Sequence, residues 1–289
     1  MKLVSITWSS ELPLLLQGAK ELSLDLEAWS YTQFSDPSEL EKCLASLKMA
    51  QMVLIHPSSD PCWDEIIPAL NPRTPVIAFG RDPSHWAAAS VPLNVTGMVN
   101  KYLLFGGPEN YKNMLMYACR EALGMNFEPN PPKEMLWQGL YHPRAKAAFP
   151  TLEEYLKWYG PMDRPTVGII FSRTYWANGD LALADAVVTE LEKEFAVLPV
   201  FCFSMGDKDL GAWSSGEVAE RIFNGRVDAI LNLQPIFRAG SLEDSIKTLK
   251  DLDVPVFHPL TVYHKTEEEW QKDIHGLSSS EVGWSVAMP

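Results

Sequence analysis

"TVGIIFSRTYWANGDLALADAVVTELEKEFAVLPVFCFS", residues 166–204, contains two apolar runs with an amphipathic segment between them. The runs at 166–173 and 196–204 have the length and composition of buried strands. Residues 180–194 predict a helix that begins at a capping Asp180. One face of that helix carries Leu183, Ala184, Val187, Val188 and Leu191. A helix that joins two fully apolar strands is typical of a parallel sheet covered by helices.

The same alternation continues on both sides of this stretch. Residues 216–225, 227–234, 242–252 and 254–260 predict helix, strand, helix and strand. Upstream, the sequence predicts strands at 2–8, 51–57 and 74–80, and helices at 38–47, 62–70 and 99–124, the last broken in two at Gly106 and Gly107. The predicted fold class is α/β, with two open, mostly parallel-sheet units of the Rossmann or flavodoxin type. We expect an amino-terminal domain at 1–134, a connector at 135–165, and a second domain at 166–289 that is truncated at its carboxyl end.

Composition excludes several classes of protein. The formal net charge is −13 over 289 residues, whereas binding to nucleic acid or to an anionic membrane surface requires a basic patch. The four cysteines are scattered without a CxxC pair, which favours free thiols in a reducing cytoplasm. We also expect neither a signal peptide nor a membrane span. Nucleotide-binding, serine hydrolase and zincin motifs are absent from the sequence, so any ATP that is used would be bound by another chain.

The candidate ligand-binding residues follow the strand at 166–172. In an open parallel sheet, ligands bind at the carboxyl ends of the strands. We expect an exposed loop here that carries Arg173, Tyr175, Trp176 and Asn178 and turns at Gly179, with Arg173 facing the cleft between the two units. An arginine, two aromatic rings and a helix N-terminus could together hold a flat acidic ligand. In the alternative, the two aromatic rings cover the sheet edge and the arginine pairs with a nearby acid.

Three His-Pro pairs provide further candidates, at His56, His142 and His258. A proline after a strand ends the ladder, so each histidine could simply be a half-buried residue at a strand end. Each could instead be a polar contact in a ligand cleft. Their separations in the sequence lack the short spacing of zinc ligands, and we predict that the three do not form a common metal site.

Two segments carry a resemblance to a known family. "YLLFGGPENYKNMLMYACREALG" and "GLYHPRAKAAFPTLEEYLKWYG", followed by the stretch quoted first, resemble the amino-terminal part of the cobaltochelatase large subunit and of the wider family that includes the magnesium chelatase H subunit. The family pattern GxYHP is met by Gly139, Tyr141, His142 and Pro143. The stretch "PVIAFGRDPSHW" before "GGPEN" points to the cobalt branch.

The resemblance implies a subunit of a metal chelatase, a ligase that forms nitrogen–metal bonds with the hydrolysis of ATP. Such an enzyme inserts cobalt into a corrinoid precursor for cobalamin biosynthesis, or magnesium into protoporphyrin. This subunit would hold the tetrapyrrole, while separate AAA+ ATPase subunits hydrolyse ATP. The complete complex would use ATP, magnesium and cobalt, with no cofactor bound by this chain. We expect the chain to be an amino-terminal fragment or a short paralogue that is inactive alone, because the catalytic acid and histidine of the family lie beyond its end; no catalytic residue is assigned.

Two other classes of function remain open on the sequence alone. A two-lobed α/β protein could be a small-ligand or sensor module, with one ligand between Arg173, His56 and His258. It could also be a docking domain without a ligand of its own, in which an acidic surface meets basic partners.

Overall fold

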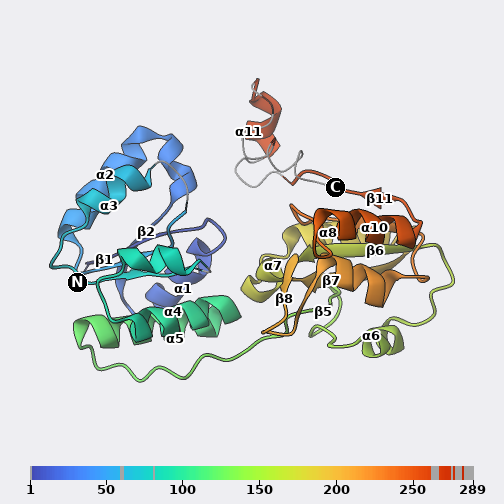
Figure 1. Ribbon diagram of the computed structural model, residues 1–289, viewed down its shortest axis with the longest axis horizontal. Coiled ribbons are helices and arrows are strands. Elements are labelled where there is room, and N and C mark those ends of the chain that lie inside the picture. The colour runs from blue at the N-terminus through green and yellow to red at the C-terminus, as the bar shows by residue number, and fades with distance from the viewer. Residues whose placement is uncertain are drawn as a thin grey trace. The chain divides into compact units, whose positions relative to one another are not determined.

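The computed structural model describes residues 2–58, 62–80, 82–261, 267–274, 276 and 282. The chain divides into two compact units, Met1–Met135 and Leu136–Pro289 (Figure 1). Of residues 281–289, the structure describes only Val282. Within the described residues, no helix has the length and hydropathy that crossing a membrane requires.

The first unit is a four-stranded parallel sheet with helices on both faces, in the order β2-β1-β3-β4. Its strands are β1 (Lys2–Thr7), β2 (Asp25–Ser30), β3 (Met52–Ile55) and β4 (Val76–Ala78). Its α-helices are α1 (Leu12–Glu21), α2 (Pro37–Met49), α3 (Trp63–Ala69), α4 (Leu93–Phe105) and α5 (Pro108–Leu123). Short 3-10 helices occupy Tyr31–Ser35 (η1) and Pro83–Ala88 (η2).

Side chains from alternate positions of these strands form two separate cores. Leu3 and Leu54 pack with α1, α4 and α5, whereas Val4 and Val53 pack with α2 and α3. Figure 1 shows α2 and α3 on one side of this sheet and α4 and α5 on the other. Because both faces are covered, the central strands β1 and β3 are mostly apolar, as the sequence indicated. The predicted break between α4 and α5 is confirmed by positive φ angles of 71° at Gly106 and 85° at Gly107.

The second unit repeats this topology in a five-stranded sheet, β11-β10-β6-β7-β5. The strands are β5 (Gly139–Leu140), β6 (Thr166–Ser172), β7 (Ala196–Cys202), β10 (Ala229–Asn232) and β11 (Val256–Phe257), and β8 (Met205–Asp207) pairs with β9 (Ala212–Ser214) as a separate ribbon. The helices are α6 (Leu152–Tyr159), α7 (Arg173–Asn178), α8 (Ala182–Leu191), α9 (Ser215–Val218), η3 (Ala219–Phe223), α10 (Leu242–Leu252) and α11 (Glu267–Lys272). Taken in chain order, the four parallel strands of each unit lie in the spatial order 2-1-3-4. The predicted fold class, two mostly parallel α/β units, is confirmed.

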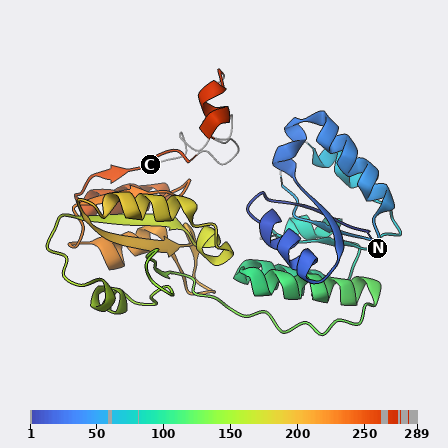
Figure 2. The ribbon, with the colours of Figure 1, turned by 180° about the vertical axis from the view of Figure 1, so that it is seen from behind.

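Helices cover both faces of the second sheet as well. Residues of α8 pack on Ile169 and Phe171, and residues of α9, η3 and α10 pack on Ile170 and Leu198. The segment α10 lies in front of this sheet in Figure 1, and α8 lies in front of it in Figure 2, which is turned by 180°. All four cysteines are buried free thiols, as predicted.

Residues 136–165, which we expected to form a connector, belong to the second unit. In this segment, β5 pairs antiparallel with β7, with Gly139 opposite Phe201. A Cβ atom at Gly139 would lie 2.8 Å from the ring of Phe201 and 2.9 Å from the carbonyl oxygen of Phe149, so only glycine allows this close pairing. Tyr155 and Tyr159 of α6 then pack into the core of the second unit, whereas Trp158 is 40% exposed.

Candidate functional site

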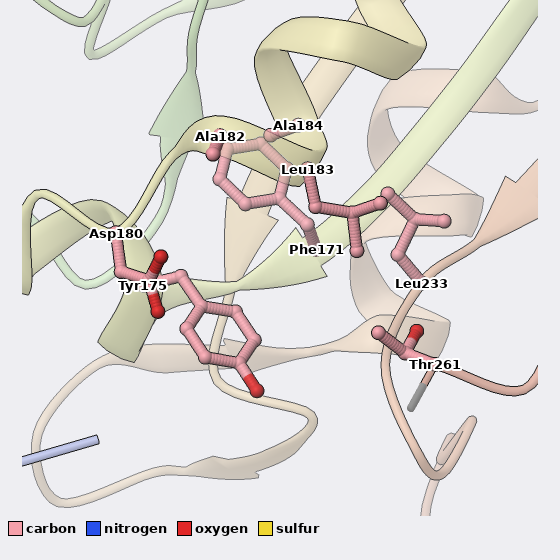
Figure 3. Close-up of a pocket in the computed structure, with 8 residues that line it drawn as sticks. All are labelled: Phe171, Tyr175, Asp180, Ala182, Leu183, Ala184, Leu233 and Thr261. Carbon is pink, nitrogen blue, oxygen red and sulfur yellow. The ribbon is translucent and has the colours of Figure 1, made fainter. Parts of the chain in front are cut away.

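A pocket of about 320 Å³ opens at the carboxyl ends of β6 and β10 in the second unit (Figure 3). The lining residues are Phe171, Tyr175, Asp180, Ala182, Leu183, Ala184, Leu233 and Thr261. From β6, the chain leads through α7 and α8 to β7 on one side, and β10 lies on the other side of β6. The pocket therefore lies at the point where the strand order reverses, which is where open α/β sheets bind their ligands.

The walls of the pocket are mainly apolar, with a few polar groups at its edge. In Figure 3, the side chains of Leu183 and Leu233 lie on one side of Phe171, and those of Asp180 and Tyr175 lie on the other. The lining contains no cationic side chain among the described residues, and Asp180 is its one carboxylate. Such a pocket suits an apolar or aromatic group whose polar end donates hydrogen bonds.

The predicted helix cap at Asp180 is wrong. The helix α8 begins two residues later, at Ala182, and its N-cap residue is Leu181. Asp180 is instead an exposed residue whose backbone N–H donates to Tyr175 O at 2.9 Å. Asp180 therefore lines the pocket and does not cap the first turn of α8.

The segment predicted as a loop, 173–179, is a short helix followed by the predicted turn. The Ser172 side chain caps α7 by accepting from Thr174 N, and Gly179 ends the helix in the left-handed conformation at φ 73°. This helix places Tyr175 in the pocket lining, while Trp176 stacks on the ring of Phe201 at 4.0 Å between centroids. The alternative interpretation therefore holds for Trp176, which covers the sheet. Asn178 and Gly179 are not among the eight lining residues.

Arg173 is buried, so the expectation that its side chain is exposed is wrong. Only 5% of its surface is accessible, and its Nε–H donates to the carbonyl oxygen of Leu136 at 2.7 Å. Its guanidinium group lies 4.2 Å from the ring centroid of Trp137. These contacts attach the chain segment before β5 to the end of β6.

His142 is fully buried beside α6. Its Nδ1 accepts from the backbone N–H of Arg144 at 3.2 Å, and its Nε2 lies 3.3 Å from Glu192 Oε1 without the alignment of a hydrogen bond. The ring centroid of Trp158 is 5.0 Å away. Burial lowers the pKa of His142, and the carboxylate of Glu192 opposes this effect only in part. The GxYHP motif thus packs its histidine into an aromatic cluster, while its Tyr141 donates to Asp185 Oδ1 at 2.6 Å.

The other two His-Pro histidines have their own local partners. His258 follows β11 and contacts the amide of Asn232 at 3.4 Å and the carbonyl oxygen of Gln234. Burial lowers its pKa below the ordinary value. His56 belongs to the first unit, where its Nδ1 lies 3.0 Å from Glu11 Oε1. The prediction that the three histidines do not share a metal ion stays a prediction.

The sequence analysis did not predict most of the residues that line the pocket. Of the eight lining residues, only Tyr175 was predicted as a ligand contact. Leu233 and Thr261 follow β10 and β11, and the rule that ligands bind at strand ends could have pointed to both. What the sequence alone does not give is the strand order, which brings Leu233 next to Phe171.

Comparison with known proteins finds a matching family model and several similar proteins. Residues 100–289, which include the whole second unit, match the family model described as CobN/Magnesium Chelatase. An uncharacterized protein of Methanocaldococcus jannaschii is 32% identical over 100% of this chain and 23% of its own length. The chloroplastic magnesium-chelatase subunit ChlH of Oryza sativa subsp. indica is 29% identical over 65% of this chain and 15% of its own length.

One solved structure shares the fold of nearly the whole chain. The catalytic subunit of cobaltochelatase from Mycobacterium tuberculosis has a TM-score of 0.54 and 18% identity, and the match covers 97% of this chain and 23% of that one. At this identity, the likeness concerns the fold alone. The chain thus spans less than a quarter of the length of each of these similar proteins.

Proposed function

The chain belongs to the CobN/Magnesium Chelatase family, and on this premise we propose that it is the amino-terminal part of the large, tetrapyrrole-binding subunit of a metal chelatase. The observation that carries the proposal is the apolar pocket at the β6/β10 reversal point, because it lies within the part of the chain that the family model matches. In this proposal, the pocket receives one edge of the macrocycle.

Several parts of the proposal concern the whole protein. The complete enzyme would insert cobalt into a corrinoid precursor or magnesium into protoporphyrin, and AAA+ subunits would supply ATP hydrolysis. This chain would have no chelatase activity alone, and its place of action would be the cytoplasm. ATP-dependent metal insertion by the purified chain would contradict the proposal that it has no chelatase activity alone.

The charge of the pocket affects which edge of the macrocycle it would bind. Asp180 would repel a propionate and would accept hydrogen bonds from an acetamide group. Arg173, which we had expected to pair with a carboxylate, is buried against Trp137. Replacement of Asp180 by Asn should therefore tighten the binding of protoporphyrin and leave or weaken the binding of a corrinoid that carries acetamides.

The proposal can be tested by titration of protoporphyrin and of an acetamide-bearing corrinoid precursor, followed by absorbance. Leu183 lines the pocket and is 43% exposed, and Leu242, 48% exposed at the start of α10, provides a matched control outside it. A fully buried leucine contributes about 1.5–3 kcal/mol, so covering the exposed part of Leu183 contributes roughly 1 kcal/mol. Leu183→Gln should weaken binding about 5-fold, and Leu242→Gln should leave it unchanged.

Three outcomes separate the proposal from the alternatives. Saturable binding that weakens only in Leu183→Gln supports the tetrapyrrole site. Binding that weakens equally in both variants contradicts the assignment of this pocket. If neither macrocycle binds, the chain is better explained as a docking domain or as a module for a different small ligand.

A further inference from the structure

The first unit carries a buried polar cluster at the position equivalent to the pocket of the second unit. Strand β1 ends at Thr7 and β3 ends at Ile55, and the strand order reverses between them. Glu11 lies after β1 and is 7% exposed, and His56 follows β3. Polar groups that are buried at such a reversal point are candidates for ligand binding.

Glu11 fixes the orientation and the tautomer of His56. Its carboxylate accepts from the hydroxyl of Thr7 and, at 3.4 Å, from the backbone N–H of Trp8. His56 Nδ1 lies 3.0 Å from Glu11 Oε1, and because a carboxylate only accepts hydrogen bonds, Nδ1 carries the proton. The lone pair of His56 Nε2 is therefore available for another contact. A carboxylate behind a histidine is the usual arrangement around metal-binding histidines.

A second histidine is directed to the same place. A Cβ atom built on Gly80 would lie 2.9 Å from His56 Nε2 and 3.3 Å from His85 Nδ1. The Nδ1 atom of His85 is buried and finds no hydrogen-bond partner in the structure as described. An unpartnered buried ring nitrogen is costly unless something binds it.

Gly80 keeps this place open. Its φ of 135° is one that residues with a side chain rarely adopt. Its backbone is held on both sides, because Asn100 Oδ1 accepts from Gly80 N at 3.1 Å and Trp86 Nε1 donates to Gly80 O at 2.9 Å. The strand end of β4 is thus fixed in a conformation that lets the two imidazole rings converge.

We propose that His56 Nε2 and His85 Nδ1 bind a divalent transition-metal ion beside Gly80, with Glu11 as the positioning carboxylate. Imidazole nitrogens select zinc, copper, nickel and related ions over magnesium and calcium. Among the residues that the structure describes, no group of three or more His, Cys, Asp or Glu side chains is placed to hold an ion. The site is therefore a two-ligand site whose remaining positions are filled by water or by a further ligand, as in sites that keep open positions.

The packing alternative is that His56 simply fills space at the strand end. Its ring lies 5.3 Å from the Phe79 ring and 5.7 Å from the Trp8 ring, centroid to centroid. That alternative accounts for His56 but leaves the buried Nδ1 of His85 without a partner. It also predicts that neither histidine affects the binding of metal ions.

The test is a titration of the untagged chain with Co²⁺, in which visible absorbance reports coordination and calorimetry reports stoichiometry. We expect one ion per chain, with binding at least 10-fold weaker in His56→Ala and in His85→Ala. Glu11→Gln should weaken binding about 10- to 100-fold while retaining both ligands. His258→Ala removes a histidine of the other unit and should leave the affinity unchanged.

Other results would overturn the inference. It fails if no saturable site appears at one equivalent, or if binding persists in both ligand variants. It also fails if His258→Ala reduces binding as much as His56→Ala and His85→Ala do. If His56→Ala does not fold, His85→Gln decides the question, because His85 lies in the short η2 segment and is only partly buried. The assay contains no tetrapyrrole, so its result is independent of the proposed function.

Discussion

Replacement of Arg173 by Ala tests whether this residue stabilises the fold or binds a ligand. The side chain is 5% exposed, donates from Nε to Leu136 O at 2.7 Å, and lies 4.2 Å from the ring centroid of Trp137. Both contacts are within the second unit. The substitution removes them together and leaves the partly buried carbonyl group of Leu136 without this donor.

The expected loss of stability follows from these two contacts. A hydrogen bond from a charged group contributes about 1.5–3 kcal/mol, and a desolvated cation–π contact about 0.5–2 kcal/mol. Because the two share one side chain, we expect a combined loss of about 3 kcal/mol rather than the sum of the upper values. For a unit of this size, that loss lowers the thermal midpoint by roughly 6–12 °C.

Thermal unfolding and protoporphyrin titration of the same variant provide the measurement. Arg221→Ala is the control, because Arg221 also lies over a tryptophan ring, at 4.9 Å from that of Trp213, but its side chain is 58% exposed. An exposed pair contributes at most about 1 kcal/mol, so the control should shift the midpoint by a few degrees at most. An Arg173→Ala protein that keeps its midpoint and loses affinity for the macrocycle would refute the structural role.

Two further predictions concern packing and pH. Gly139→Ala should lower the free energy of unfolding, measured in denaturant, by about 1–3 kcal/mol, because the added Cβ atom would contact Phe201. Gly97→Ala is the control, because a Cβ atom there meets no described atom within 4 Å. This control should raise the free energy of unfolding by up to about 1 kcal/mol. Burial lowers the pKa of His142 and of His258 below 6.5, so below that pH the unfolded chain binds more protons than the folded one. As the pH drops from about 6.5, each of the two histidines should lower the stability of the second unit by up to about 1.4 kcal/mol per pH unit. A urea midpoint that does not change over this range would contradict the buried, neutral state of both rings.

The elements that could be predicted are those whose sequence pattern is decided locally. Strands β6 and β7 are buried on both faces, so they appear as apolar runs. The edge strand β2, "DLEAWS", mixes charged and apolar residues because it is only partly covered, and it was missed. Helix α1 was missed because Pro13 suggests a break, although a proline in the first turn of a helix is tolerated.

The candidate site was less predictable because it depends on contacts between distant parts of the chain. Arg173 is buried by Leu136 and Trp137, which are 36 or more residues away in the sequence. Nothing in the pattern around residue 173 indicates that partner. Likewise, His85 and His56 both lie beside Gly80 because β3 and β4 are neighbours and the glycine carries no side chain.

The shared 2-1-3-4 topology gives both units a reversal of strand order at the same place in the sheet, and the side chains at that place differ between them. The reversal of strand order opens the sheet edge whatever the side chains are, so residues there do not have to fill a core. The second unit lines this edge with Leu183, Leu233 and one carboxylate, which suits part of an apolar macrocycle. The first unit places Glu11 and His56 there, which suits an ion. The two proposals therefore stand or fall separately: Leu183→Gln should leave Co²⁺ binding unchanged, and His85→Ala should leave macrocycle binding to the isolated chain unchanged.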